Sequence, residues 1–179
     1  RRHTRSVSAF LLNRSSDLDN LQYDVLFNTL GSRVGRGEEE FRKVDYTYVV
    51  NSCSLCEKLN ISHFSNCSAG NADKKSCFLY SRVKGEAEED CLIQRVNYIS
   101  IFRPGIILDR DNDSRCGEKF VGFFCCCWRV TSKEIALAMM VDDLDFQMEI
   151  KDKDKEKEFE KKSKRISNSE IKTIAQKGN

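Results

Sequence analysis

The chain has 179 residues, the size of one ordinary domain, and is long enough to bury a core of its own. Its 30 Lys and Arg residues nearly balance its 28 Asp and Glu residues, and the formal charge of +2 indicates no general attraction to nucleic acid or to an anionic membrane. No apolar run approaches the roughly 20 residues of a membrane span, and the basic start RRHTR leads into an apolar block too short for a secretory signal. Because the chain does not begin with methionine, we expect a partial or processed chain.

Apolar runs and amphipathic runs alternate through the middle of the chain. Three strands are predicted, each a short run that stops at glycine, small polar residues or proline: residues 23–31, 61–69 and 96–105. Two helices are predicted from apolar residues at helical steps and from the absence of proline: residues 40–60 and 77–93, the second with Gly85 as its weak point. This alternation predicts an α/β fold of parallel βαβ units with right-handed crossovers.

The rest of the chain gives weaker patterns. Residues 106–130 pass through a polar loop into a further helix or apolar segment, and the CCCW run, residues 125–128, is expected to pack in the interior. Residues 151–165 alternate in charge and have almost no apolar content, so we expect a solvated helix or a disordered insertion there.

The nine cysteines indicate a reducing compartment. Their number is odd, and most of them lie inside apolar segments, which favours free thiols over a disulfide framework. Cys53 and Cys56 have the spacing of metal ligands, but no second pair follows them and they fall in a helical pattern. We therefore expect core thiols there and no metal site.

In a parallel sheet of this kind, ligands bind at the carboxyl ends of the strands. The predicted ends carry polar residues or glycine: Leu30 with Gly31, Ser68, and the FRPG of residues 102–105. These ends are expected to converge beside the helix of residues 77–93, which carries Tyr80 and Lys84.

Tyr80 and Lys84 lie one helical turn apart, on one face. A tyrosine hydroxyl is a poor acid or base at neutral pH unless a nearby cation favours the phenolate, and Lys84 could supply that charge. Ser68 could hydrogen-bond a substrate carbonyl and hold it against the tyrosine. On spacing alone, the simpler interpretation is a half-buried helix aromatic with a solvated lysine beside it.

Ser68, the Tyr80-x-x-x-Lys84 pair and the FRPG segment together resemble the short-chain dehydrogenase/reductase superfamily, in its atypical or extended branch. Five segments within residues 24–125 agree in order and spacing with an NADP-binding group of this superfamily: DVLFNTLGS, FRKVDYTYV, HFSNCSAGNADKKSCFLYSRVKGEAEE, YISIFRPGIILDR and SRCGE. The resemblance implies a Rossmann-like, doubly wound parallel sheet with helices on both faces.

The resemblance also assigns the catalytic roles. It implies that Tyr80 is the proton donor or acceptor, that Lys84 is its electrostatic partner and a ribose ligand, and that Ser68 orients the substrate carbonyl. These three residues are the predicted catalytic set.

The cofactor implied by the resemblance is NADP, in its reduced form NADPH. Besides Tyr80 and Lys84, the predicted cofactor-binding residues are those that match the family's cofactor wall and its phosphate contact: Leu30, Gly31, Ile107, Arg115 and Arg1, the last paired with Arg2.

The chain departs from the family at several positions. No GxGxxG or GxxGxxG turn stands where it could hold a pyrophosphate, so we expect a sheet that lacks the first strand and the phosphate-binding turn. Ala69 stands where the family has a second serine-type residue, and Cys116 stands in place of a proline. We divide the chain into a partial NAD(P)-binding domain, a charged insertion or linker, and a C-terminal helix: residues 1–145, 146–165 and 166–179.

Two functions follow from this reading. The first is an NADP-dependent oxidoreductase acting on a small carbonyl or alcohol, with a regulatory role in nuclear import and apoptosis; whether this chain alone is active is left open. The alternative is a non-catalytic Rossmann-fold interaction protein that binds a nuclear import receptor. The resemblance implies a cytoplasmic location, with the nucleus or nuclear envelope as a second site, and no direct nucleic-acid partner.

Overall fold

The computed structural model describes residues 23–109, 128–153 and 161–178. The predictions for Arg1, Arg2, Arg115, Cys116 and residues 125–127 concern positions outside these ranges. The described chain forms two compact units. Unit 1 holds the described residues 23–68, 72–101 and 161–164, and unit 2 holds residues 69–71, 102–109, 128–153 and 165–178.

A four-stranded parallel sheet contains the strands in the order β1-β2-β3-β6. Its members are β1 (Val25–Asn28), β2 (His63–Cys67), β3 (Tyr98–Arg103) and β6 (Lys162–Ser167). Strands β1 and β2 pair in parallel, with Val25 opposite His63 and Asn28 opposite Asn66. The first three strands confirm the three that the sequence predicts, and with the helices between them they confirm the Rossmann-like α/β fold.

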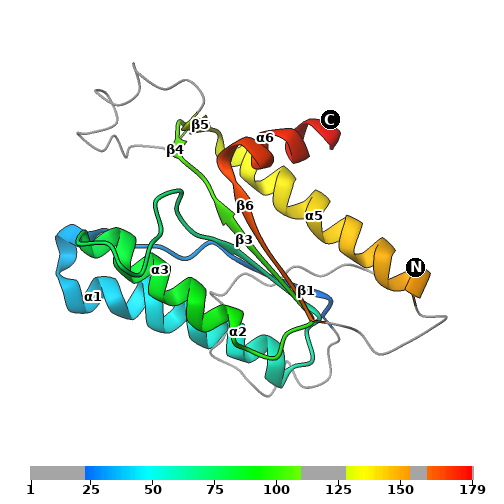
Figure 1. The fold of residues 1–179 in the computed structure, drawn as a ribbon, viewed down its shortest axis with the longest axis horizontal. Helices are drawn as coiled ribbons and strands as arrows, with labels where there is room; N and C mark the ends of the chain where they lie inside the picture. The colour runs from blue at the N-terminus through cyan, green and yellow to red at the C-terminus, as the bar shows by residue number, and fades with distance from the viewer. Residues whose placement is uncertain (1–22, 110–127, 154–160, 179) are drawn as a thin grey trace. The chain divides into compact units, whose positions relative to one another are not determined.

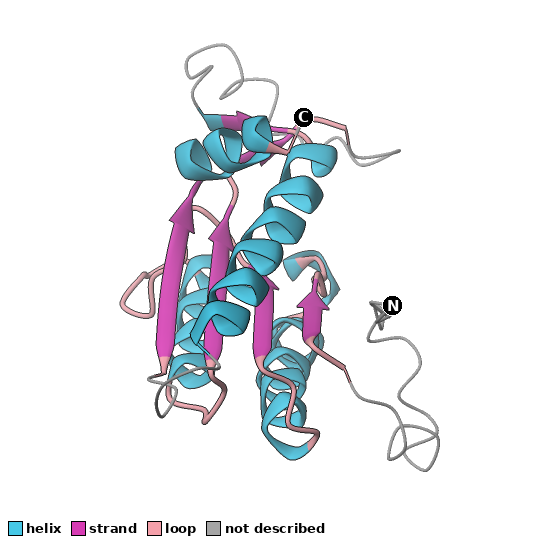
Figure 2. Ribbon diagram, turned by 90° about the vertical axis from the view of Figure 1, so that its right-hand side faces the viewer, coloured by secondary structure: helices cyan, strands magenta, loops and turns pink. Residues whose placement is uncertain are grey.

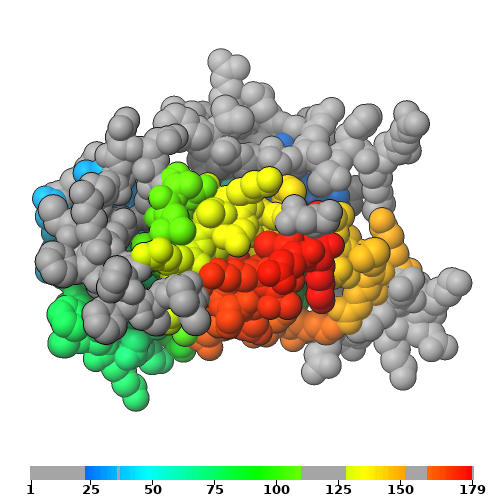
Figure 3. All heavy atoms as spheres, turned by 90° about the horizontal axis from the view of Figure 1, so that it is seen from above, coloured from blue at the N-terminus to red at the C-terminus, as the bar shows by residue number. Residues whose placement is uncertain are grey.

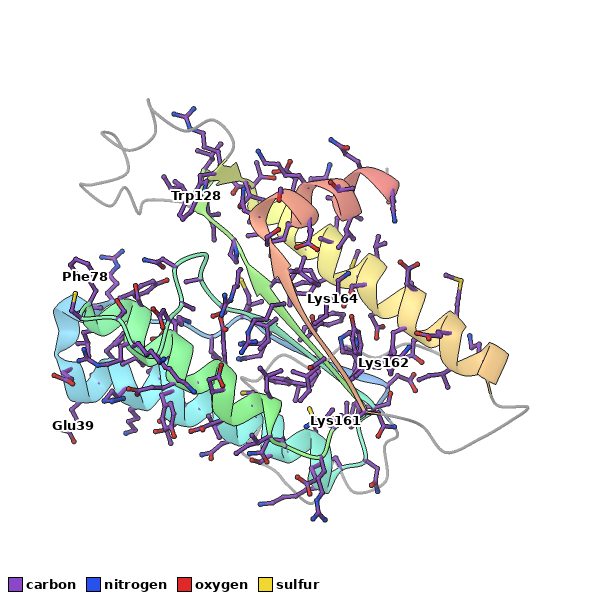
Figure 4. The ribbon with its side chains drawn as sticks, in the orientation of Figure 1. Glu39, Phe78, Trp128, Lys161, Lys162 and Lys164 are labelled. Carbon is purple, nitrogen blue, oxygen red and sulfur yellow. The ribbon has the colours of Figure 1, made fainter. Side chains whose placement is uncertain are left out.

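Strand β6 corrects one prediction. Residues 162–165 were expected in a solvated helix or a disordered insertion, but they form the outer strand at one end of the described sheet. Lys161, Lys162 and Lys164 are labelled along this segment in Figure 4. Lysine is common on edge strands because its charge discourages pairing with another chain, and the buried Ile166 anchors the strand. The run of charges is therefore typical of an edge strand, and its single buried residue, Ile166, does not define a period of two.

The helices of unit 1 cover one face of β1, β2 and β3 (Figure 1). The segment predicted at 40–60 consists of α1 (Glu38–Arg42), a π-helical turn η4 (Lys43–Thr47) and α2 (Tyr48–Lys58), preceded by a short 3-10 turn, η3 (Val34–Arg36). The segment predicted at 77–93 is α3 (Leu79–Leu92). Their apolar faces meet the strands in one core, which includes Leu26, Val49, Cys53, Cys56, Phe64, Ala87, Cys91, Ile99 and Ile101.

Unit 2 contains the short parallel pair β4 (Ile106–Ile107) and β5 (Arg129–Val130), and the helices α5 (Ser132–Lys153) and α6 (Asn168–Lys177). The two helices pack side by side (Figures 2 and 3). Ser167 and Glu170 form a capping box at the start of α6, which satisfies amides that the first turn leaves unpaired. Trp128, expected to be packed, is 47% exposed.

Helix α5 has no counterpart among the predicted elements. Asp142 and Asp143 interrupt its apolar pattern, although both are buried, so the helical period was not visible in the sequence. The division of the chain at residues 145 and 165 stays a prediction; α5 runs across the first position and β6 across the second. None of the described helices combines the length and apolar composition that a membrane crossing requires.

Candidate active site

The carboxyl end of β1 turns through a pair of asparagines. Asn28 donates its amide to Asn66 Oδ1 at 2.8 Å, which ties the end of β1 to that of β2. Asn28 Oδ1 accepts a hydrogen bond from the Leu30 amide at 3.4 Å, an arrangement that replaces regular strand pairing with a turn. The chain thus leaves the sheet at the predicted position, with Leu30 half-buried and Gly31 exposed.

Lys84 lies directly beneath this turn. A Cβ built on Gly31 would lie 3.9 Å from Lys84 Nζ and 3.6 Å from Asp45 Oδ1. The Lys84 side chain is only 7% exposed and forms an ion pair with Asp45 at 2.8 Å. The interpretation of Lys84 as a solvated neighbour of Tyr80 is therefore wrong, because the ammonium is buried and has a charged partner.

Asp45 is itself held in place from two sides. Its side chain is 1% exposed, and its Oδ2 accepts hydrogen bonds from the Ser32 amide at 2.7 Å and from the Ser32 hydroxyl at 2.6 Å. Asp45 lies in the π-helical turn η4, a widened turn of a kind that is frequent at functional sites. The turn after β1, the helical segment of residues 38–58 and α3 therefore meet at one buried charge pair.

Ser68 follows β2 and faces α3. Its hydroxyl donates to Glu88 Oε1 at 2.5 Å, and both side chains are buried. Since a hydroxyl carries one hydrogen, Ser68 in this arrangement offers a ligand its lone pairs and not a donor. A carbonyl-orienting role would require Ser68 to exchange Glu88 for the substrate.

Tyr80 is half-buried near the start of α3. Its ring stacks on that of Phe41, with centroids 5.8 Å apart and planes inclined by 28°, and Phe41 is fully buried in α1. This packing fixes the ring one helical turn from Lys84. Phe78, just before α3, is 72% exposed and projects from the molecule (Figure 4).

The loop that leads to Tyr80 is bound tightly to α3. The Asp73 amide donates to Ser81 O at 2.9 Å, and Arg82 Nη1 donates to Ser76 O at 3.1 Å. Gly85 allows this approach, since a Cβ built there would lie 2.2 Å from Lys74 N. Gly85 was expected to weaken the helix, but its absent side chain is what lets the loop pack.

The CxxC pair is part of the core. Cys53 and Cys56 are buried free thiols on α2, and Cys91 on α3 is buried beside them. Burial raises the pKa of the Cys56 thiol. A side-chain hydrogen bond with Cys53 that favours the protonated Cys91 thiol, together with burial, raises the pKa of Cys91. Thiols held in this way are poor nucleophiles and poor metal ligands.

The predicted residues are only partly brought together by the described structure. Leu30, Gly31, Ser68, Tyr80 and Lys84 all belong to unit 1. Ile107 belongs to β4 in unit 2 and is half-buried. Arg1 and Arg115 lie outside the described residues, so their assignment as cofactor ligands stays a prediction.

Asp45, Ser32 and Glu88 are site residues that the sequence patterns did not predict. A signal for two of them was present, because Asp45 and Glu88 occupy the apolar faces of their helices, where a carboxylate needs a partner. Asp45 stands four residues after the buried Phe41, and Glu88 stands four residues after Lys84. No local signal marked Ser32.

The five segments quoted above resemble the Tat-interacting protein, and comparison with curated proteins supports this resemblance. Protein HTATIP2 of Rattus norvegicus is 39% identical over 111 residues, which make up 59% of this chain and 46% of that protein. Protein FMP52-2, mitochondrial, of Scheffersomyces stipitis is 33% identical over 88 residues, 48% of this chain and 38% of that protein. The chain spans less than half the length of these relatives. No protein-family model matches the sequence.

Solved structures with a similar fold include sugar-nucleotide epimerases. The UDP-glucuronic acid 4-epimerase from Bacillus cereus in complex with NAD has a TM-score of 0.54 at 11% identity, over 90% of this chain and 70% of that one. A UDP-galactose 4-epimerase has a TM-score of 0.57 at 10% identity, over 84% of this chain and 59% of that one. At such identities the likeness shows the fold alone.

Proposed function

We propose that the chain is a divergent member of the short-chain dehydrogenase/reductase superfamily, similar to protein HTATIP2, and that it carries the acid-base residues of an NADP-dependent oxidoreductase. Its substrate would be a small carbonyl compound or the corresponding alcohol. The observation that carries the proposal is the position of Lys84, buried under the exposed backbone of Gly31 and one turn from Tyr80.

The residues of this site suit the binding of a dinucleotide. Gly31 presents backbone without a side chain at the carboxyl end of a parallel strand, where ligands of such sheets bind. Lys84 lies within reach of a group laid across Gly31, and the fixed ring of Tyr80 lies one turn before it. A nicotinamide cofactor, when bound, would supply or accept the hydride.

Tyr80 is assigned the proton transfer. In the reducing direction its hydroxyl would donate a proton to the substrate oxygen, and in the oxidising direction it would accept one. Lys84 would orient the cofactor ribose and stabilise the charge that develops on Tyr80. Ser68 would orient the substrate oxygen after releasing Glu88.

The preference for NADP over NAD rests on Arg1, with Arg115 in the cofactor wall. An arginine can meet the additional phosphate of NADP with paired hydrogen bonds. We expect Arg1→Ala to weaken binding of NADPH and to leave binding of NADH unchanged. Equal effects on both cofactors would contradict the assignment.

A fluorescence titration of the full chain with NADPH tests the proposal. Binding should be saturable, and Tyr80→Phe should keep the binding while abolishing turnover of a carbonyl panel. A chain that shows no binding, or a Tyr80→Phe variant that turns over as fast as the parent, would refute it. Tyr48→Phe is the matched control, since Tyr48 is an exposed tyrosine on α2.

The Ser68 hydrogen bond favours a second candidate function. A serine whose hydrogen is committed to the buried Glu88, followed by Ala69 in place of a second hydroxyl, leaves the site poor in donors for a substrate oxygen. A non-catalytic Rossmann-fold interaction protein would show these features. NADPH binding without turnover in both the parent chain and Glu88→Gln would favour it.

Under either function, the proposed binding partner and the proposed cellular location of the protein rest on the resemblance of the five sequence segments. We propose a nuclear import receptor as the partner, with a cytoplasmic protein that also reaches the nucleus or nuclear envelope. The fungal relative carries a mitochondrial name, which applies to that protein. A pull-down of the full chain with import receptors tests the partner, and the absence of any capture would refute it.

A further inference from the structure

The two ends of the described sheet differ in exposure. At one end, β1 is covered, since Val25 and Asn28 are 2% and 0% exposed. At the other end, β6 presents Ser163 and Lys164 as exposed residues, and only Ile166 of this strand is buried. The end of the described sheet at β6 is therefore the one that is accessible to another molecule.

The first part of β6 is strongly cationic. Four of the five residues 161–165 are lysine or arginine and none is acidic, whereas the whole chain has a formal charge of only +2. Lys161, Lys162 and Lys164 follow one another along this segment in Figure 4. We call residues 161–165 the cationic edge. Because like charges on neighbouring strands repel, a second copy of this strand is a poor partner for it.

The hydrogen bonds of β6 show which of its backbone groups point outward. The Lys162 amide donates to Asn97 O at 2.8 Å, just before β3, so the backbone of Lys162 faces β3. Backbone groups of successive strand residues point to alternate sides, so the N–H and C=O of Ser163 point away from β3. Lys161 fixes the start of the cationic edge, since its ammonium donates to Leu92 O at the end of α3 at 2.5 Å.

We propose that the cationic edge binds an extended acidic peptide, which adds to the sheet as a further strand beside β6. Hydrogen bonds to the outward backbone of Ser163 set the register, and carboxylates on the peptide meet the lysines. The charge that keeps a second lysine-rich strand away thus selects a strand of opposite sign.

A peptide suits this edge better than a nucleic acid does. An extended peptide has both the acceptor and the donor that an outward N–H and C=O require, whereas the phosphate groups of a nucleic acid offer acceptors alone. The inference does not depend on the proposed function, since no residue of the cationic edge belongs to the candidate active site. An inactive chain would bind the peptide equally well.

Fluorescence anisotropy of a labelled peptide with alternating glutamate and threonine measures binding to the full chain. Binding should be saturable and should weaken as salt is added, because the contacting charges are exposed. A peptide of the same sequence with all its amides N-methylated keeps every charge and has no N–H to donate, so it should bind several-fold more weakly. Equal affinity of the two peptides overturns the inference, and so does a parent chain that binds neither.

Two pairs of variants test the same edge from the side of the protein. Ser163→Pro removes an outward N–H that β3 does not use, at a kind of position where sheets tolerate proline, and Ser163→Ala keeps that N–H. The first should lower the affinity several-fold and the second should leave it unchanged. Lys164→Glu should also lower the affinity several-fold, whereas Lys177→Glu, the same charge reversal at an exposed residue of α6, should have little effect.

The remaining outcomes separate strand addition from general attraction of charges. Equal losses of affinity in Lys164→Glu and Lys177→Glu would overturn the inference, because the peptide would then respond to the net charge of the chain. A short single-stranded RNA or an anionic lipid vesicle that binds the parent chain more tightly than the peptide would overturn it as well. If thermal unfolding shows that Ser163→Pro does not fold, the comparison of the two peptides decides, because it needs no variant.

Discussion

Replacing Gly85 with alanine should destabilise the protein, although the same change in an ordinary exposed helix position stabilises it. The added Cβ would lie 2.2 Å from Lys74 N and 2.4 Å from the Asp73 carbonyl carbon, distances at which backbone atoms cannot remain. The loop must move by about an ångström, which strains the Asp73 to Ser81 hydrogen bond. Overpacking of this kind costs about 1–3 kcal/mol.

The helix itself gains from alanine by about 1 kcal/mol. The net expectation for Gly85→Ala is a loss of up to about 2 kcal/mol, or up to about 8 °C in the melting temperature of a chain of this length. Circular dichroism during thermal and urea unfolding measures both quantities. Gly35→Ala is the control, since no atom lies within 4 Å of a Cβ built there. A Gly85→Ala variant that is more stable than the parent chain by the helix gain of about 1 kcal/mol would refute the close approach of the loop.

The contacts of Gly31 and of Asp109 give two further predictions. Gly31→Ala places a methyl group in ordinary van der Waals contact with Asp45, so stability should change by less than about 0.5 kcal/mol. The affinity for NADPH, measured by fluorescence titration, should fall because the methyl group covers the ion pair of Lys84 and Asp45. A large loss of stability would contradict this prediction. Hydrogen bonds from the Ser132 amide and hydroxyl lower the pKa of Asp109 below its ordinary 3.8, so its contribution to stability is present above that value and is lost as the pH falls through the lowered pKa. The urea midpoint of the parent chain should thus fall more steeply below about pH 4 than that of Asp109→Asn, and parallel curves would disprove the linkage.

The first three strands and the helices between them could be predicted because each is short and bounded by a strong local signal. Strand β1 is largely buried and apolar, and it ends at Asn28, shortly before the turn that holds Gly31. Strand β3 ends at Arg103 and is followed by the chain's one proline. Strand β6 gave no such signal. One buried residue, Ile166, stands among charged neighbours, and a single apolar position cannot define a period.

The candidate site could be predicted where it depends on positions along one element and not where it depends on contacts between elements. Tyr80 and Lys84 share α3, so their spacing alone placed them on one face. The partner of Lys84 comes from η4, and the residue that anchors that partner comes from the turn after β1. Asp45 could have been suspected as a carboxylate on an apolar helix face, but its partner could not be named without the fold.

The two candidate functions depend on which of two buried carboxylates controls the site. Asp45 faces Lys84, and its effect is to hold an ammonium in place under Gly31, which favours binding of a ligand whether or not chemistry follows. Glu88 faces Ser68 and accepts the hydroxyl hydrogen with which Ser68 would orient a substrate oxygen. Since the carboxylates act on different partners, Glu88→Gln should alter turnover without altering the affinity for NADPH, and Asp45→Asn should alter that affinity first. The ligand-binding and the chemical parts of this site are therefore separable by mutation within one helix pair.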